Sequence, residues 1–346
     1  MMYHNVTILI NGIAAGLFGL TAVLFLFVFK RTHLRTVLGI ILAIYALYLA
    51  KDIAYAYDPI ASDGYLYRML LSIDNWAVPL YVIYAVEVLS PGKTTLWLGV
   101  CLELPFLLLT VVYSIWPVEW LFNATMAFSL LFSAICALWV FRMTVKYRRR
   151  LMDNCSDITN MDIRWMWVSI AIFLPNLLLW TLVSARLDYV LDALYYITLS
   201  VSWGIVAWHT YFFVPQGNPD TRGDAVPPMS VASWNFTRKL NSLASDGYFV
   251  RSPRLTLSEL AAELGTNRTT LSNYLNQELG TTFYDYINSH RITKAEELLS
   301  EPSSRYSAEQ LAELSGFNSL STFRRAFFKK HGLSPSQYRE KVLERR

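Results

Sequence analysis

Two passages of this chain share one pattern: LSELAAELGTNRTTLSNYLNQELG at residues 257–280 and AEQLAELSGFNSLSTFRRAFFKKHG at residues 308–332. In each, apolar residues at helical spacing precede a glycine, Gly265 or Gly316, and a second run at helical spacing follows. A short helix, a glycine turn and a second helix make a helix-turn-helix unit, whose second helix lies in a DNA major groove. The C-terminal part is therefore predicted to be helical and to contain two such units, about residues 256–279 and 307–331.

The first unit carries local signals for both of its helices. Thr256 followed by Glu259 is a capping box that opens the first helix, and Asn267 is a favourable N-cap for the second. The residues of the second helix that are predicted to face inward are Leu271, Leu275 and Leu279.

The opposite face of that second helix is predicted to contact DNA. Thr269, Ser272 and Asn273 lie together on it, and their hydroxyl and amide groups can hydrogen-bond base edges. Arg268 and Thr270 lie beside them and complete the predicted DNA contacts of this unit.

The second unit repeats these signals. Ser307 with Gln310 makes a second capping box, and Ser319 is the expected N-cap of a helix with Phe323 and Phe327 facing inward. The predicted DNA contacts of this helix are Leu320, Ser321, Arg324, Arg325 and Lys329. Because it is rich in Arg and Lys and has no acid, it is expected to supply much of the salt-dependent grip on phosphates, although one of its arginines could instead bind a guanine.

Residues 256–339 resemble the DNA-binding domain of the AraC/XylS family of bacterial transcription regulators. The resemblance is carried by both passages and by the string GF-x5-F-x3-F-x4-G-x-SP-x2-YR at residues 316–339. It implies two recognition helices, joined by a stiff spacer helix (residues 283–299 here), in successive major grooves. Leu320 departs from the polar residue usual at its position. Most relatives sense through a soluble domain, so their ligand class does not carry over.

The part before residue 214 has a different composition. The whole chain of 346 residues is 54% hydrophobic with a mean hydropathy of +0.32, high values for a soluble protein, and the excess lies in this part. A helix that crosses a bilayer needs about 20 apolar residues. Seven runs qualify, about residues 6–29, 34–56, 66–89, 94–114, 119–141, 165–184 and 188–213. The predicted fold class is therefore all-α, with a seven-helix transmembrane bundle at residues 1–213.

Loop charges predict the orientation of these spans. Alternate loops on one side carry ten basic residues: Lys30, Arg31, Arg35, Lys93, Arg142, Lys146, Arg148, Arg149, Arg150 and Arg164. The other side carries three: Lys51, Arg68 and Arg186. We therefore expect a multi-pass protein of the bacterial inner membrane, with its amino terminus outside and its C-terminal domain in the cytoplasm. The run KYRRR at residues 146–150 also fits a nucleic-acid patch, but its place in a loop favours a topological role.

Polar residues inside the spans are candidates for signal sensing, because such residues are costly in a membrane. They are Asp74, Glu103, Asn176 and Asp192, and no lysine or arginine is expected at a comparable depth to pair with the acids. One hypothesis is that Asp74 and Glu103 line a cavity that takes a cation, an amine or protons. The alternative is that they make satisfied polar contacts between helices.

The intervening residues 214–233 are rich in proline and glycine and are predicted to be a linker. It leads to a DNA-binding domain at residues 234–346, which begins with a short amphipathic helix (residues 234–245) that could pack on this domain or pair with a second copy. Three cysteines without motif spacing indicate no disulfide framework or metal site, and no cofactor or enzymatic activity is expected.

Together these features predict a membrane-integrated one-component transcription regulator. The expected partners are double-stranded promoter DNA, the lipid bilayer, a second copy in a homodimer, an unknown small-molecule or membrane signal, and RNA polymerase if the protein is an activator. A transporter or membrane enzyme with a DNA-binding regulatory tail is the main alternative. A scaffold whose helix-turn-helix units no longer bind DNA is a third.

Overall fold

The computed structural model describes residues 2–53, 63–159, 161–185, 189–213, 236–301 and 306–343. Regular structure in these ranges is helical, and the one strand-like pairing there is an isolated antiparallel bridge between Cys155 and Thr256. The predicted all-α fold class is confirmed. The chain divides into two compact units, Met1–Val145 with Ile163–Asn218 and Lys146–Asp162 with Pro219–Arg346. The predicted linker lies outside the described residues.

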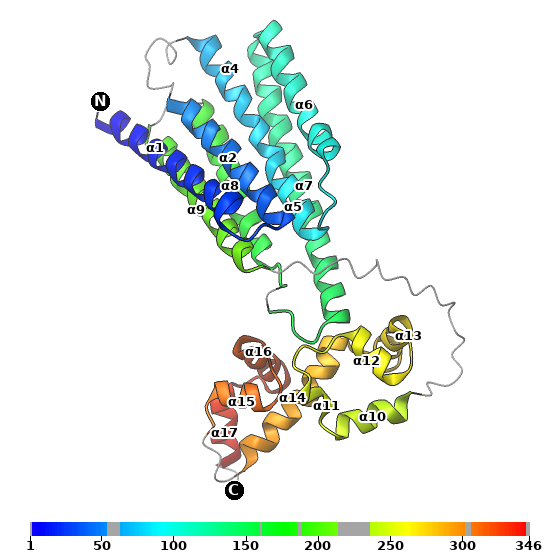
Figure 1. Cartoon of the computed structure of the whole chain (residues 1–346). Helices are drawn as coiled ribbons and strands as arrows, with labels where there is room; N and C mark the ends of the chain where they lie inside the picture. The colour runs from blue at the N-terminus through cyan, green and yellow to red at the C-terminus, as the bar shows by residue number, and fades with distance from the viewer. Residues whose placement is uncertain are drawn as a thin grey trace. The chain divides into compact units, whose positions relative to one another are not determined.

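The first unit is a bundle of long helices (Figure 1). Within the described ranges, seven helical stretches are long and apolar enough to cross a membrane. They are α1 (Met2–Val23) with a π-helical turn (Leu24–Val28), α2 (His33–Asp52), α4 (Gly64–Asp74) continuing through a 3-10 turn (Asn75–Ala77) into α5 (Val78–Leu89), α6 (Leu96–Ile115), α7 (Glu119–Asn154), α8 (Trp165–Ala185) and α9 (Tyr189–Phe212).

Aromatic rings and a few polar pairs hold the bundle together. Trp203 of α9 is 1% exposed, and its ring centroid lies 5.0 Å from that of Tyr45 and 5.3 Å from that of Phe173. The indole nitrogen of Trp76 donates to the hydroxyl of Thr110 (3.0 Å). Interhelical contacts of both kinds are typical of helices that associate in lipid, where the hydrophobic effect does not drive packing.

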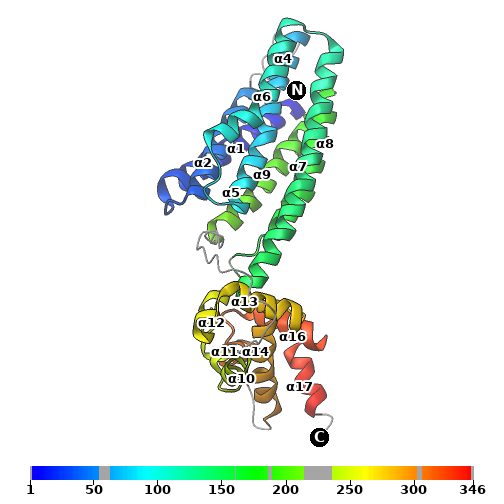
Figure 2. The same ribbon diagram turned by 90° about the vertical axis from the view of Figure 1, so that its right-hand side faces the viewer.

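The second compact unit contains both helix-turn-helix passages, residues 257–280 and 308–332. Its helices are the end of α7, α10 (Thr237–Ser245), α11 (Tyr248–Arg251), α12 (Leu257–Leu264), α13 (Arg268–Asn273) with a π-helical continuation (Tyr274–Glu278), α14 (Phe283–Ser300), α15 (Ala308–Leu314), α16 (Leu320–His331) and α17 (Pro335–Leu343). Figures 1 and 2 show α14 running between α12–α13 and α15–α16.

The spacer helix α14 contributes to two separate hydrophobic cores. Phe283 and Ile287, in its first turns, are buried with α12 and α13. Ile292, Ala295 and Leu299, further along, are buried with α15 and α16. Because one continuous helix belongs to both cores, the distance between the two helix-turn-helix units is set by a rigid element.

The short helix α10 packs on the DNA-binding domain. Leu240 is 1% exposed and belongs to the core around α12 and α13, with Leu243 packed against it. This contact supports the first of the two interpretations left open for residues 234–245. Trp234, at the predicted start of that helix, lies outside the described residues.

Candidate DNA-binding site and membrane cavity

The predicted capping signals of the first helix-turn-helix unit are present. The hydroxyl of Thr256 accepts from the N–H of Glu259 (3.3 Å), and the Glu259 carboxylate accepts from the N–H of Thr256 (2.8 Å). The side-chain oxygen of Asn267 accepts from the N–H of Thr270 (2.7 Å). Each cap of this kind contributes about 1 kcal/mol to the stability of its helix. The entry of both helices is thus fixed by local hydrogen bonds.

The outer face of α13 carries the predicted DNA contacts. Thr269 and Asn273 are exposed. The hydroxyl of Ser272 accepts from the side-chain amide of Asn276, one turn further on (3.2 Å). The half-buried residues on this helix are Arg268, Thr270 and Ser272. The face therefore presents small polar groups, whose use as base contacts stays a prediction.

The prediction that three leucines of this helix face inward is wrong for one of them. Leu271 and Leu275 are fully buried as expected, but Leu279 is 43% exposed. The chain changes from α-helix to π-helix at Tyr274–Glu278, and Gly280 follows with φ of +60°. The wider π turn shifts the side-chain direction, so a position counted with α-helical spacing ends on the surface.

The second helix-turn-helix unit has the predicted caps and the predicted inward-facing residues. Ser307 and Gln310 form a reciprocal capping box, and the hydroxyl of Ser319 accepts from the N–H of Thr322 (3.2 Å). Phe323 and Phe327 are fully buried. The same local devices therefore build both units.

The basic residues of α16 are paired with acids from other elements. Arg324 lies 4.0 Å from Glu309. Three more pairs join α16 to other elements: Arg325 with Asp162 (3.8 Å), Lys329 with Asp285 (2.7 Å) and Lys330 with Glu296 (2.7 Å). Partly exposed ion pairs contribute about 0–1 kcal/mol each, so DNA phosphates can displace these acids at a small cost.

Two apolar residues change the predicted contact surface of α16. Leu320, predicted to face DNA, is half-buried and packs against the second hydrophobic core. Phe328, which the sequence analysis missed, is 62% exposed and lies four residues after Arg324, on the same side of the helix. The sequence signal for Phe328 was an aromatic residue one helical turn after the predicted DNA contact Arg324.

Comparison with known proteins agrees with this geometry. A family described as "Helix-turn-helix domain" matches residues 260–341. An uncharacterized HTH-type transcriptional regulator of Bacillus subtilis, YtdP, is 33% identical over 86 residues, which are 25% of this chain and 11% of that protein. A probable transcriptional regulator of Photobacterium leiognathi, LumQ, is 28% identical over 102 residues, 29% of this chain and 40% of that protein. This chain thus spans less than half the length of either relative, and no solved structure matches it significantly.

The C-terminal domain is a helix-turn-helix domain of the AraC type. The glycine turn of its second helix-turn-helix unit is packed more closely against other atoms than the turn of the first. A Cβ atom on Gly265 would meet no atom within 4 Å, whereas one on Gly316 would lie 2.3 Å from the carbonyl oxygen of Val250. Both glycines have positive φ, +71° and +81°. The turn of the second unit therefore needs glycine for its conformation and also for close contact with the backbone of α11.

A buried arginine ties the parts of the AraC-type domain together. Arg291 of α14 is fully buried and donates to the carbonyls of Phe249 (3.0 Å) and Ser252 (2.7 Å) and to the side chain of Asn288 (3.2 Å). Burial lowers the pKa of Arg291 to about 10, which leaves the guanidinium charged near neutral pH. The sequence analysis did not identify this residue, because its acceptors are backbone groups distant in sequence.

In the helical bundle, the expectation that the acids have no lysine or arginine partner is wrong for Asp74. The amine of Lys51 at the end of α2 lies 2.9 Å from Asp74 at the end of α4 and 2.7 Å from Asp52. The hydroxyl of Tyr196 donates to Asp52 (3.2 Å). The count of loop charges includes Lys51 although it lies inside the predicted span 34–56, which is why this pair was not predicted. Two carboxylates against one amine leave a net charge of −1 when all three are ionised.

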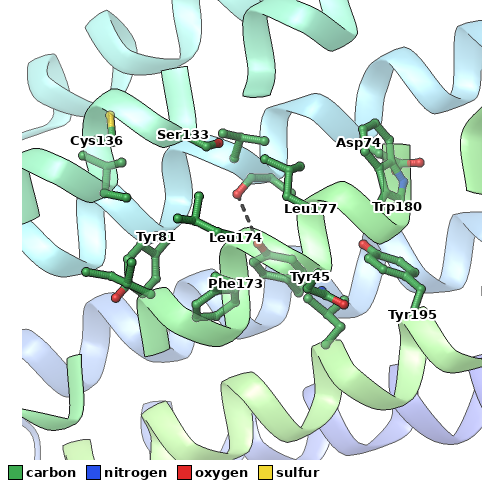
Figure 3. A pocket seen from close by; sticks show the side chains of 17 residues that line it. Tyr45, Asp74, Tyr81, Ser133, Cys136, Phe173, Leu174, Leu177, Trp180 and Tyr195 are labelled. Carbon is green, nitrogen blue, oxygen red and sulfur yellow. Dashed lines mark hydrogen bonds between the residues drawn. The ribbon is translucent and has the colours of Figure 1, made fainter. Parts of the chain in front are cut away.

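A cavity of about 100 Å³ adjoins this charged group (Figure 3). Two of the four predicted sensing residues, Asp74 and Asn176, line it; in the part of the chain that is described, Glu103 and Asp192 do not. Asn176 is 5% exposed and accepts a hydrogen bond from Thr198. The aromatic residues of the wall are Tyr45, Tyr81, Phe173, Trp180 and Tyr195.

Proposed function

We propose that this chain is a membrane-integrated one-component transcription regulator. The observation that carries the proposal is the presence, in one chain, of seven helices suited to a bilayer and an AraC-type helix-turn-helix domain. The excess of basic residues in alternate loops supports a cytoplasmic DNA-binding domain in a bacterial inner membrane. Such a protein needs no phosphorelay, because sensor and DNA reader are covalently joined.

The DNA-binding part of the proposal assigns the two units different roles. The polar face of α13, with Thr269, Ser272 and Asn273, reads base edges in one major groove. The basic face of α16, with Arg324 and Lys329, supplies mainly phosphate contacts in the next. Promoter DNA is the proposed target, a homodimer the proposed active form, and RNA polymerase a partner if binding activates transcription.

The sensing part of the proposal places the signal in the cavity of the bundle. When Lys51, Asp52 and Asp74 are all ionised, their net charge of −1 attracts a cation, and the aromatic rings of the wall can pack against an organic one. The signal is therefore a small cation, an amine or a proton. Binding would shift the protein between arrangements that do and do not bind DNA.

Mapping of DNA bound to the full-length protein in its own cells tests the proposed function. We expect discrete enrichment at promoters, with all of the protein in the membrane fraction. Absence of enrichment at any promoter would contradict DNA-binding regulation. Flux of a small solute in vesicles that contain the purified protein would favour the transporter alternative.

Replacing Asp74 tests the sensing site. Asp74→Asn removes the carboxylate charge at the cavity, so stabilisation of the purified protein by tetramethylammonium or choline, measured as an increase in Tm, should be lost. Glu119→Gln is the matched control, because Glu119 is a solvent-exposed acid, 3.8 Å from Arg68, on the same unit. An equal response of wild type and Asp74→Asn to both cations and to pH would contradict a sensing role.

A further inference from the structure

The residues between α7 and α8 are packed into the AraC-type domain. We call Cys155–Thr159 with Met161–Asp162 the α7–α8 segment. The backbone N–H and the hydroxyl of Ser156 both donate to the carbonyl of Leu255, at 3.2 and 2.7 Å. Cys155 forms the isolated bridge with Thr256, at the N-cap of α12. The segment is thus joined to the start of the first helix-turn-helix unit by backbone hydrogen bonds.

The spacer helix binds the same segment. The side-chain amide of Asn288 donates to the carbonyl of Ser156 (3.1 Å), and the guanidinium of Arg291 donates to the Ser156 hydroxyl (3.3 Å). Ser156 and Asn288 are 0% and 2% exposed. Ser156 and Asn288 therefore belong to the interior of the domain and hydrogen-bond each other there.

Apolar contacts reinforce this attachment. Ile158 is 1% exposed and belongs to one buried cluster with Leu151 and Cys155 on its own side and Tyr284 of α14 on the other. Burying an isoleucine side chain removes apolar surface from water and so stabilises the contact. The cluster therefore adds an apolar attachment to the hydrogen bonds of the segment.

The far end of the segment covers the start of the recognition helix α16. The side-chain amide of Asn318 donates to the carboxylate of Asp157 (2.8 Å). The hydroxyl of Thr159 hydrogen-bonds those of Ser319 (2.8 Å) and Thr322 (2.9 Å). Asp162, with its side chain 10% exposed, lies 3.8 Å from the guanidinium of Arg325.

These are the groups that a DNA backbone would use. The amino-terminal end of a helix attracts phosphates, and an arginine on a recognition helix binds phosphate or guanine. Asp157 accepts from Asn318 beside that end of α16, and Asp162 lies 3.8 Å from Arg325, so the two carboxylates compete with DNA for these side chains and repel phosphates. DNA and the α7–α8 segment are in competition for one surface.

We propose that the surface formed by Asn318, Ser319 and Arg325 binds the α7–α8 segment of the same chain in place of DNA, and that release of this segment frees the second helix-turn-helix unit. The inference rests on the proposed function. The segment also joins the two helices that supply Ser133, Cys136, Asn176 and Trp180 to the cavity wall. A ligand that moves α7 against α8 therefore acts directly on the segment.

Binding of duplex DNA to the full chain in lipid nanodiscs tests the proposal. The probe is a duplex of about 40 base pairs, selected from a random pool by the protein itself, long enough for both units. Asp157→Asn/Asp162→Asn should tighten binding about tenfold, through lost competition and lost repulsion. Asp153→Asn is the control, since it removes one nearby negative charge, half of that removed by the double variant, at the end of α7, where Asp153 interacts with Arg149 of its own helix. It should change affinity less than about twofold.

Equal affinities of the wild type and the double variant would overturn the inference and leave the proposed function intact. An equal gain in Asp153→Asn would overturn it too, since a general charge effect would then explain both. Failure of every variant to select any duplex would overturn the proposed function itself, and this inference with it.

A crosslink gives an independent test that does not change charge. In a Cys155→Ser background, Thr159→Cys with Thr322→Cys places two thiols where hydroxyls now lie 2.9 Å apart. Added to Asp157→Asn/Asp162→Asn, the oxidised crosslink should reverse that variant's tighter binding to the selected duplex, and a reductant should restore it. Full binding by the crosslinked protein, or no crosslinking at all, would overturn the inference.

Discussion

The two helix-turn-helix units are built with the same local devices but differ in how much of their recognition helix is free. Both open on capping boxes and turn at positive-φ glycines. The face of α13 presents small polar groups, with Thr269 and Asn273 exposed. The start of α16 is covered by the α7–α8 segment, and its cations are paired with acids. A duplicated unit can therefore keep one fold in both copies while only one copy has its recognition helix in contact with the α7–α8 segment.

The two glycine turns show the same difference in packing. Gly265 adopts φ of +71° next to open space, whereas Gly316 adopts +81° against the backbone of Val250. The first turn depends only on local conformation. The second turn also depends on a tertiary contact, which fixes the second helix-turn-helix unit against α11, the short helix that precedes the first unit.

The largest expected effect comes from Gly316→Ala. A Cβ atom 2.3 Å from the Val250 carbonyl oxygen forces the backbones apart, in addition to the cost of a positive φ. We expect a loss of about 3 kcal/mol or more in the stability of the second unit. Gly265→Ala carries only the conformational cost, about 1 kcal/mol. Hydrogen exchange of the α12 and α15 amides in the full chain measures both, and equal losses would show that the Val250 contact is unimportant.

Replacing Arg291 should have the next largest effect. Arg291→Met leaves the carbonyls of Phe249 and Ser252 without their donor inside the domain. We expect a loss of about 3 kcal/mol in stability. Lys294→Ala, on the exposed side of the same helix in an ion pair with Glu297, should cost less than about 0.5 kcal/mol. Chemical denaturation of the full chain, with protease resistance of this domain as the readout, compares the stability of the two variants. Equal stability of Arg291→Met and the wild type would show that Arg291 does not stabilise the domain.

DNA-binding measurements on one residue from each unit sharpen the difference in roles. Asn273→Ala should relax preference at one base pair by about 1–3 kcal/mol and leave the salt dependence unchanged. In the Asp157→Asn/Asp162→Asn background, where the second helix-turn-helix unit is free, Lys329→Ala should weaken all duplexes alike and lower the salt slope by at most about one, because Lys329 already pairs with Asp285. Binding to a set of single-base variants at several salt concentrations gives both quantities. Loss of base preference in Lys329→Ala instead would reverse the assigned roles.

The smallest effects come from the capping boxes, where the units should behave alike. Thr256→Ala and Ser307→Ala each remove one side-chain acceptor from a helix N-terminus. Both should cost about 1 kcal/mol. Thermal unfolding of the two variants checks this equality. A much larger cost for one of them would mean that it has contacts beyond its cap.

These results also show which features the sequence could predict. Caps such as Asn267 and Ser319 and buried positions such as Leu271 and Phe323 depend on residues within one or two turns, and they were predicted correctly. Leu279 was wrong because a π turn breaks the helical spacing.

Features that depend on distant residues were missed. The pairing of Lys51 with Asp74 and the attachment of Ser156 to Leu255 and Arg291 join parts of the chain far apart in sequence. No periodicity or capping pattern encodes them. The candidate base contacts of α13 and α16 stay predictions.

Hydroxyl-radical footprinting of the selected duplex by the full chain in nanodiscs tests the central claim most directly. Without a signal, the wild type should protect one patch, through the first unit. Asp157→Asn/Asp162→Asn should protect two patches about 34 Å apart, one for each unit. Two equal patches with the wild type, or a single patch with the double variant, would contradict the account.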